Sequence, residues 1–223
     1  MTADQTDAPE DLLGRADACY HDAVFGGEPG ELVGADRALD QVEARLAVLR
    51  GKVVHARFLA DRVADPEELR LFERAVALYR ALGDERGEGE ALFWAGCYHQ
   101  VVQGEGGAAL PLLERARELA HRTGDRLTLS YAVRHLGFAA YDAGDADTAA
   151  ALQRESIRLR EEIGFTAGAA AGKAALAYLE ARAGRPAQAE QLLAEAATEA
   201  AAVDAKGVLG WVEQTRAELA GGQ

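Results

Sequence analysis

Apolar and small residues recur at helical spacing through most of the chain, most clearly between residues 125 and 145. One stripe there consists of Val133, Leu136, Gly137 and Ala140. Its steps of three, one and three residues are typical of a helix face that packs on a neighbour. The pattern predicts one helix over residues 125–143 and a second over residues 146–163, which Gly164 ends. This part of the chain should therefore form a pair of helices joined by a short turn.

The same pattern repeats along the chain with a period of 40 or 41 residues. Three sets of small residues recur in step: Gly83, Gly124 and Gly164; Gly96, Gly137 and Ala177; and Ala108, Ala149 and Ala189. Residues 71–84 also align with residues 112–125, which extends the period one unit upstream. A fixed period in this range is typical of stacked helical repeats. The expected units are residues 36–84, 85–124, 125–164 and 165–204, followed by a C-terminal helix over residues 205–220.

Proline beside acidic residues marks two further helix starts. Asp65 can cap a helix that has Pro66 in its first turn, and Glu68 can complete a capping box. The same logic near the N-terminus predicts a helix over residues 8–25. The glycine-rich residues 26–34 then predict a linker.

The chain is expected to divide into an acidic N-terminal arm, residues 1–34, and a helical repeat domain, residues 35–223. The formal net charge is −13, and residues 1–45 carry 11 acids but only three arginines. Nucleic acid and anionic membranes are not expected as partners, because binding to either needs clustered cations. Alanine dominates the apolar residues, and both proline and β-branched runs are scarce, which predicts an all-α fold.

Cysteine content and hydropathy predict a soluble cytoplasmic protein. Cys19 and Cys97 are too few and too far apart in sequence to indicate a disulfide framework or a paired-cysteine metal site. The first residues lack the basic and apolar regions of a signal peptide, and no run of 18 apolar residues occurs. The absence of asparagine and the excess of arginine over lysine indicate a bacterial gene of high GC content.

The repeat resembles the tetratricopeptide repeat family, whose units are helix-turn-helix pairs. The resemblance is carried by Leu136 and Gly137 before Ala149, by Ala95 and Gly96 before Ala108, and by Leu176 and Ala177 before Ala189. The period is longer than the family's, and His99, Ala140 and Glu180 stand where the family has a Tyr. The resemblance implies a right-handed superhelical solenoid of antiparallel helix pairs, with an extra N-terminal helix and a C-terminal capping helix.

A second face of the helices carries aromatic and polar side chains. These residues are Tyr131, Arg134, His135, Phe138 and Tyr141, with Glu90, Phe93, Trp94, Cys97 and Gln100 one period upstream and Tyr178 and Arg182 one period downstream. The resemblance implies that this face lines a concave groove where a ligand or partner binds. Arg134 can pair with Asp142 or Glu90, or it can grip a carboxylate or phosphate. The alternative is that the N-terminal helix, or the C-terminal helix around Trp211, covers these rings as part of the core.

Known catalytic and metal-binding motifs are missing. The sequence has no G-x-S-x-G elbow, no P-loop and no dinucleotide-binding fingerprint. His99 occupies a packing position of the family's repeat, and the spacing of histidines and acids supports no metal site, so neither metal nor cofactor is expected. Acid–base chemistry by His135 with Tyr131 is an alternative, because histidine titrates near neutral pH.

The favoured function is that of a protein or peptide interaction module, in a bacterial adaptor or regulatory accessory protein. The second hypothesis is a small-molecule or short-peptide sensor that binds in the aromatic groove, and the third is an unrecognised acid–base enzyme. The missing asparagines argue against adaptors that grip the C-terminal tail of a chaperone. No basic recognition helix indicates DNA binding, and the sequence leaves the oligomeric state open.

Overall fold

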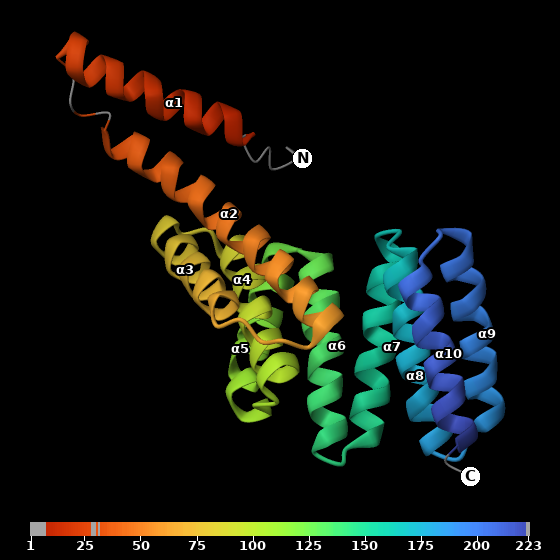
Figure 1. Cartoon of the computed structure of the whole chain (residues 1–223). Helices are drawn as coiled ribbons and strands as arrows, with labels where there is room; N and C mark the ends of the chain where they lie inside the picture. The colour runs from red at the N-terminus through yellow and green to blue at the C-terminus, as the bar shows by residue number, and fades with distance from the viewer. Residues whose placement is uncertain (1–7, 28–29, 31, 222–223) are drawn as a thin grey trace.

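The structure is a computed structural model that describes residues 8–27, 30 and 32–221 (Figure 1). Among these residues there is no strand, and most lie in helices. The helices are α1 Pro9–His21, α2 Leu32–Asp61, α3 Glu67–Leu82, α4 Glu85–Cys97, α5 Gly106–Thr123, α6 Arg126–Asp142, α7 Ala146–Glu162, α8 Thr166–Arg182, α9 Pro186–Ala202 and α10 Lys206–Gly221. Two short π-helical segments, η1 Asp22–Gly26 and η3 Tyr98–Gln103, extend α1 and α4. The predicted all-α class is confirmed.

Consecutive helices pack as pairs that follow one another along a solenoid. The pairs are α2 with α3, α4 with α5, α6 with α7 and α8 with α9. Each pair contacts the next, through α3 and α4, α5 and α6, and α7 and α8. The colour order in Figure 1 follows this progression from one end of the molecule to the other. The helical repeat architecture predicted from the 40-residue period is therefore present.

Glycine and aspartate set the ends of the paired helices. Gly83, Gly124 and Gly164 have φ values of 74°, 71° and 71°, a left-handed conformation that glycine adopts without a steric penalty. Asp84 and Asp125 cap the helices that follow. The side-chain oxygen of Asp84 accepts a hydrogen bond from the backbone N–H of Gly87 at 2.9 Å, and that of Asp125 accepts one from Thr128 at 3.1 Å. These local signals explain why the sequence predicted the helix ends closely.

The small residues of the packing stripe allow paired helices to approach closely. A Cβ atom added at Gly96 would lie 2.9 Å from Leu113 on α5. At Gly137 it would lie 3.0 Å from Nε2 of Gln153 on α7. Both glycines therefore lie at the helix contact, as predicted from their position on the stripe.

The N-terminal helix packs back on α2, and the last residues of the predicted linker are helical. α1 packs against α2, and α2 already begins at Leu32 and runs for 30 residues. Residues 32–34 of the predicted linker are thus helical, because Ala35 and Ala38 continue the buried pattern of α2 toward its start. Residues 28, 29 and 31 of that linker lie outside the described part of the chain.

The capping box predicted at Glu68 is wrong. Asp65 does accept a hydrogen bond from the backbone N–H of Glu67, at 2.9 Å. The side chain of Glu68, however, is fully buried and accepts a hydrogen bond from Nδ1 of His55 on α2, at 2.8 Å. The carboxylate of Glu68 therefore bonds His55 of another helix and not the backbone at the start of its own helix.

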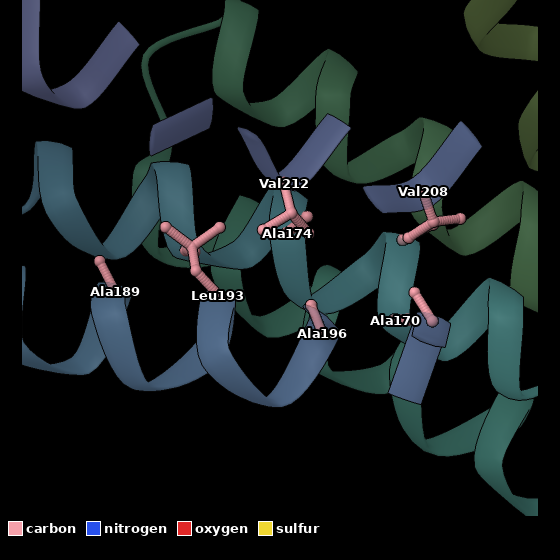
Figure 2. Close-up of a cluster of buried hydrophobic side chains, with 10 residues drawn as sticks. Ala170, Ala174, Ala189, Leu193, Ala196, Val208 and Val212 are labelled. Atoms are coloured by element: carbon pink, nitrogen blue, oxygen red, sulfur yellow. The ribbon is translucent and has the colours of Figure 1, made fainter. Parts of the chain in front are cut away.

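The C-terminal end is closed by α10, which packs against both α8 and α9. Figure 2 shows Val208 and Val212 of α10 against Ala170 and Ala174 of α8, with Leu193 of α9 completing the cluster. Alanine on α8 and α9 leaves room for the larger valines of α10. Within the described residues, no helix has the length and apolar character needed to cross a bilayer.

Candidate functional site

The predicted site residues come from three neighbouring helices and one π-helical segment. They are Glu90, Phe93, Trp94 and Cys97 on α4, Gln100 in η3, Tyr131, Arg134, His135, Phe138 and Tyr141 on α6, and Tyr178 and Arg182 on α8. Ring contacts join the helices: Phe93 stacks on Tyr131 with centroids 5.3 Å apart, and Tyr141 meets Tyr178 edge-on at 6.1 Å. We call the shared surface that carries Phe93, Trp94, Tyr131, His135, Phe138 and Tyr141 the aromatic face.

Burial divides the aromatic face into a base and an accessible layer. Phe93, His135 and the neighbouring Cys97 are buried. The accessible layer consists of the half-buried side chains Trp94, Tyr131, Arg134, Phe138 and Tyr141. The N-terminal helix packs on α2 and the C-terminal helix on α8 and α9, and Trp211 is half exposed. The residues of the base are thus buried in the core, as the alternative interpretation expected. The side chains of the accessible layer keep part of their surface in contact with solvent.

Arg134 lies on the aromatic face without a carboxylate partner. Its guanidinium stacks over the ring of Phe138 at 5.2 Å and makes no ion pair or side-chain hydrogen bond with a described residue. Glu90, one of the two partners considered for it, instead pairs with Lys52 of α2. Burial, together with the nearby charge of Arg160, lowers the pKa of Arg134 to about 10. Arg134 remains charged at neutral pH, but no negative charge among the described residues pairs with it.

A second arginine, Arg160 of α7, lies beneath Tyr131 and was missed by the sequence reasoning. It is 2 % exposed, and its Nη1 donates to the carbonyl of Gly168 at 2.8 Å. Its guanidinium lies 4.9 Å from the centroid of Tyr131 and 5.9 Å from that of Phe165. Burial lowers the pKa of Arg160, and no described carboxylate pairs with it. In the sequence it resembled one of many exposed helix arginines, so no local signal identified it.

Two further polar groups of the accessible layer lack protein partners. The hydroxyl of Tyr131 and the indole N–H of Trp94 form no hydrogen bond with any described residue. Burial raises the pKa of Tyr131, so the phenol stays protonated and can donate. Together with Arg134, these groups present hydrogen-bond donors and positive charge on one surface of an acidic protein.

His135 is held as a neutral ring. Nδ1 of His135 donates to Oε1 of Gln100 at 2.7 Å, while Nε2 of Gln100 donates to the backbone carbonyl of His135 at 3.0 Å. Burial, reinforced by the charges of Arg134 and Arg160, lowers the pKa of His135 to about 3. A ring with so low a pKa is a weak base at neutral pH, so this geometry favours a structural role over the acid–base alternative.

A buried group of three titratable side chains lies behind Trp94. His55 bonds Glu68 through Nδ1, and its Nε2 lies 3.9 Å from Sγ of Cys97. The arrangement has the residue types of a thiol catalytic triad, but burial and the charge of Glu68 raise the pKa of Cys97 to about 12. Because all three side chains are buried and the thiol stays protonated, the group is structural in this geometry.

The remaining predicted residues lie apart from this centre. Nδ1 of His99 bonds Glu105 at 3.0 Å, so His99 joins neither His55 nor His135. In the described part of the chain, no group of three or more His, Cys, Asp or Glu side chains has the arrangement of a metal site. Tyr178 and Arg182 line a cavity of about 890 Å³ between α8, α9 and α10. They therefore form a separate region, connected to the aromatic face through Tyr141.

Comparison with known proteins gives no family assignment. No family model matches the chain. A search of curated proteins also finds no similar sequence. The function must therefore be inferred from the geometry of the aromatic face.

Proposed function

We propose that the chain is an interaction module that binds a peptide segment of a partner protein on the aromatic face, with a peptide carboxylate on Arg134. The observation that carries the proposal is the guanidinium of Arg134, a half-buried residue, which lacks a carboxylate or a hydrogen-bond acceptor among the described residues. Many other arginines of this chain pair with acids, as Arg74 does with Glu43. An uncompensated arginine beside rings is typical of a binding surface.

The electrostatics favour an anion at this position. The charge of Arg160 disfavours the charged form of Arg134, and both guanidinium groups lose hydration through burial. A bound carboxylate would restore hydrogen bonds to Arg134 and offset the repulsion between the two guanidinium groups. A charge-assisted hydrogen bond of this kind contributes about 1.5 to 3 kcal/mol.

The layout of the rings favours a peptide over a compact ligand. Trp94, Tyr131, Phe138 and Tyr141 lie along two helices and are only half-buried. Small-molecule sites enclose most of the surface of their ligand, whereas partner segments bind to open surfaces that present aromatic and arginine anchors. The free donors of Trp94 and Tyr131 suit the carbonyl groups of a peptide backbone.

The proposal includes an architectural class and a compartment. The 40-residue period and the close helix contacts at Gly96 and Gly137 support a tetratricopeptide-like repeat, a fold that presents binding surfaces along its length. The free thiols of Cys19 and Cys97 support a reducing compartment such as the bacterial cytoplasm.

Selection from a peptide display library tests the proposal directly. The chain has two tryptophans, so a Trp211→Phe background leaves Trp94 as a fluorescent reporter within the aromatic face. Selected peptides should be enriched in Asp, Glu or a free C-terminal carboxylate, and their binding should change the fluorescence of Trp94. In this background, Arg134→Met should raise Kd about 10- to 100-fold, because it removes charge-assisted hydrogen bonds.

Arg117→Met is the matched control, because Arg117 is exposed on α5, outside the aromatic face. It should leave Kd unchanged, and melting curves should show that both variants are folded. Equal affinity of wild type and Arg134→Met for the selected peptides would contradict the proposal. If the library yields no binder and native mass spectrometry shows a co-purified small anion that Arg134→Met loses, the small-molecule alternative replaces it.

A further inference from the structure

Two arginines adjoin the same tyrosine of the aromatic face. The guanidinium of Arg160 lies 4.9 Å from the ring centroid of Tyr131, and Arg134 follows Tyr131 by three residues on the same side of α6. Burial, and then the charges of both arginines, lower the pKa of His135 to about 3. The two cations therefore act on one small region of the aromatic face.

Neither cation is neutralised by the described part of the chain. Arg134 and Arg160 form no ion pair with a described residue, and Glu90, whose charge reaches Tyr131, pairs with Lys52 of α2 instead. A buried cation without an acid costs free energy, and the charge of Arg160 adds to that cost at Arg134. The chain has 37 acidic side chains, so two buried arginines without an acid are an exception that needs a cause.

Both guanidinium groups keep donors that a ligand can reach. Nε of Arg160 donates to Oγ of Ser130 at 3.3 Å and Nη1 donates to the carbonyl of Gly168, but Nη2 forms no hydrogen bond with a described residue. Every fully buried polar atom without a partner in the described side chains is a carbonyl or carboxylate oxygen, so Nη2 retains some accessible surface. The same holds for the nitrogens of Arg134, which also lack a partner.

A phosphomonoester matches these donors better than a carboxylate does. At neutral pH it carries a charge of about −1.5 to −2 and three strong acceptor oxygens. A carboxylate carries a single charge, so a carboxylate on Arg134 would leave the charge of Arg160 uncompensated. Guanidinium groups bind phosphate oxygens through paired, charge-assisted hydrogen bonds, which suits two arginines with free N–H groups.

We infer that the aromatic face prefers a phosphorylated peptide, with the phosphate of a phosphoserine or phosphothreonine bound by Arg134 and by Nη2 of Arg160. The inference rests on the proposed function, because it takes the aromatic face as the peptide site, and it replaces the carboxylate on Arg134 by a dianion. The half-buried rings of Trp94 and Phe138 remain for the residues that flank the phosphorylated side chain. Phosphorylation of the partner would then switch binding on.

Three dye-labelled peptide pools test the charge requirement on the wild-type chain. Each pool has degenerate positions around one fixed residue, which is phosphoserine, the methyl ester of its phosphate, or glutamate. In fluorescence anisotropy, the apparent Kd of the phosphoserine pool should be about 10- to 100-fold lower than that of either other pool, because only this pool brings a second negative charge. Equal values for the phosphoserine and glutamate pools would overturn the inference and leave the peptide proposal standing.

Arg160→Met tests the second anchor of the phosphate. It should raise the apparent Kd of the phosphoserine pool about tenfold or more and leave that of the glutamate pool unchanged. A purely structural role of Arg160 would weaken both pools alike, and this result would overturn the inference. Arg158→Met is the matched control, because Arg158 is exposed on the same helix and pairs with Glu162, and it should change neither value. If circular dichroism melting shows that Arg160→Met is unfolded, the comparison of the three pools on wild type decides.

Competition separates a phosphorylated peptide from a small phosphate ligand. Free phosphoserine and inorganic phosphate should displace the phosphoserine pool far more weakly than an unlabelled copy of the pool does, because they lack the contacts with the rings. Equal competition would indicate a site for a small phosphate and overturn the peptide assignment. If none of the three pools binds, the inference and the proposed function fail together.

Discussion

The buried His135 should make the stability of the protein fall in acid. Its ring lies in the base of the aromatic face, and burial together with Arg134 and Arg160 lowers its pKa from 6.5 to about 3. The unfolded chain binds a proton at His135 once the pH falls below 6.5, whereas the folded ring stays neutral until about pH 3. The contribution of the neutral His135 ring to the free energy of unfolding is therefore fully present above pH 6.5. It is lost as the pH falls toward 3.

The size of this effect follows from the pKa difference. Each pH unit between 6.5 and 3 costs about 1.4 kcal/mol of unfolding free energy for one proton. Lowering the pH from 7.5 to 4.5 should thus remove about 2.5 kcal/mol through His135 alone. Other groups titrate in the same range, so the quantity to measure is the difference between wild type and a variant that lacks this imidazole.

Urea unfolding of wild type and His135→Gln, followed by tryptophan fluorescence at pH 7.5 and 4.5, measures that difference. The stability advantage of wild type over His135→Gln should shrink by about 2.5 kcal/mol between the two pH values. His121→Gln is the control, because His121 is exposed on α5 and is hydrated in both states. A wild-type advantage that changes by less than about 0.5 kcal/mol, the scale of extrapolation error, would refute the assignment of a buried neutral ring.

Two stability predictions follow from the packing. Gly137→Leu should cost about 1 to 3 kcal/mol, because its side chain would collide with Gln153 of α7, and an unchanged melting temperature would refute that contact. His55→Leu should cost about 3 to 5 kcal/mol in urea unfolding, because it leaves the fully buried carboxylate of Glu68 without its hydrogen bond. The double variant His55→Leu/Glu68→Leu should recover much of that loss, and a double variant as unstable as the single one would show that the pair is not coupled.

The helix boundaries were predictable because their causes are local. Gly124 ends α5 in a left-handed conformation, and the adjacent Asp125 caps α6 with its own side chain. Both effects depend on residues within a few positions in the sequence. The stripe around Gly137 likewise needed only helical spacing. The same local arrangement recurs in each unit of the repeat, so the boundaries of one unit apply to the next.

The buried polar groups were not predictable, because their partners come from other helices. Glu68 fitted a capping box by its spacing, yet it lies against His55, 13 residues earlier in the chain. Arg160 donates to Gly168 of the next helix and stacks on Tyr131 of the preceding one. Sequence spacing identifies the side of a helix on which a residue lies, but it does not identify the side chain that arrives opposite.

The central feature of the molecule is that α2 is amphipathic in two directions. One side carries His55 and Phe58 into the repeat core, and Lys52 reaches Glu90 on α4. The other side carries Ala35 and Ala38, which are buried where α1 packs on α2, with Leu39 exposed beside this contact. The second stripe therefore serves the fold of the chain itself, because α1 buries Leu12 and Ala16 against it. The distribution of apolar residues on α2 therefore lets this one helix join α1 to the repeat core.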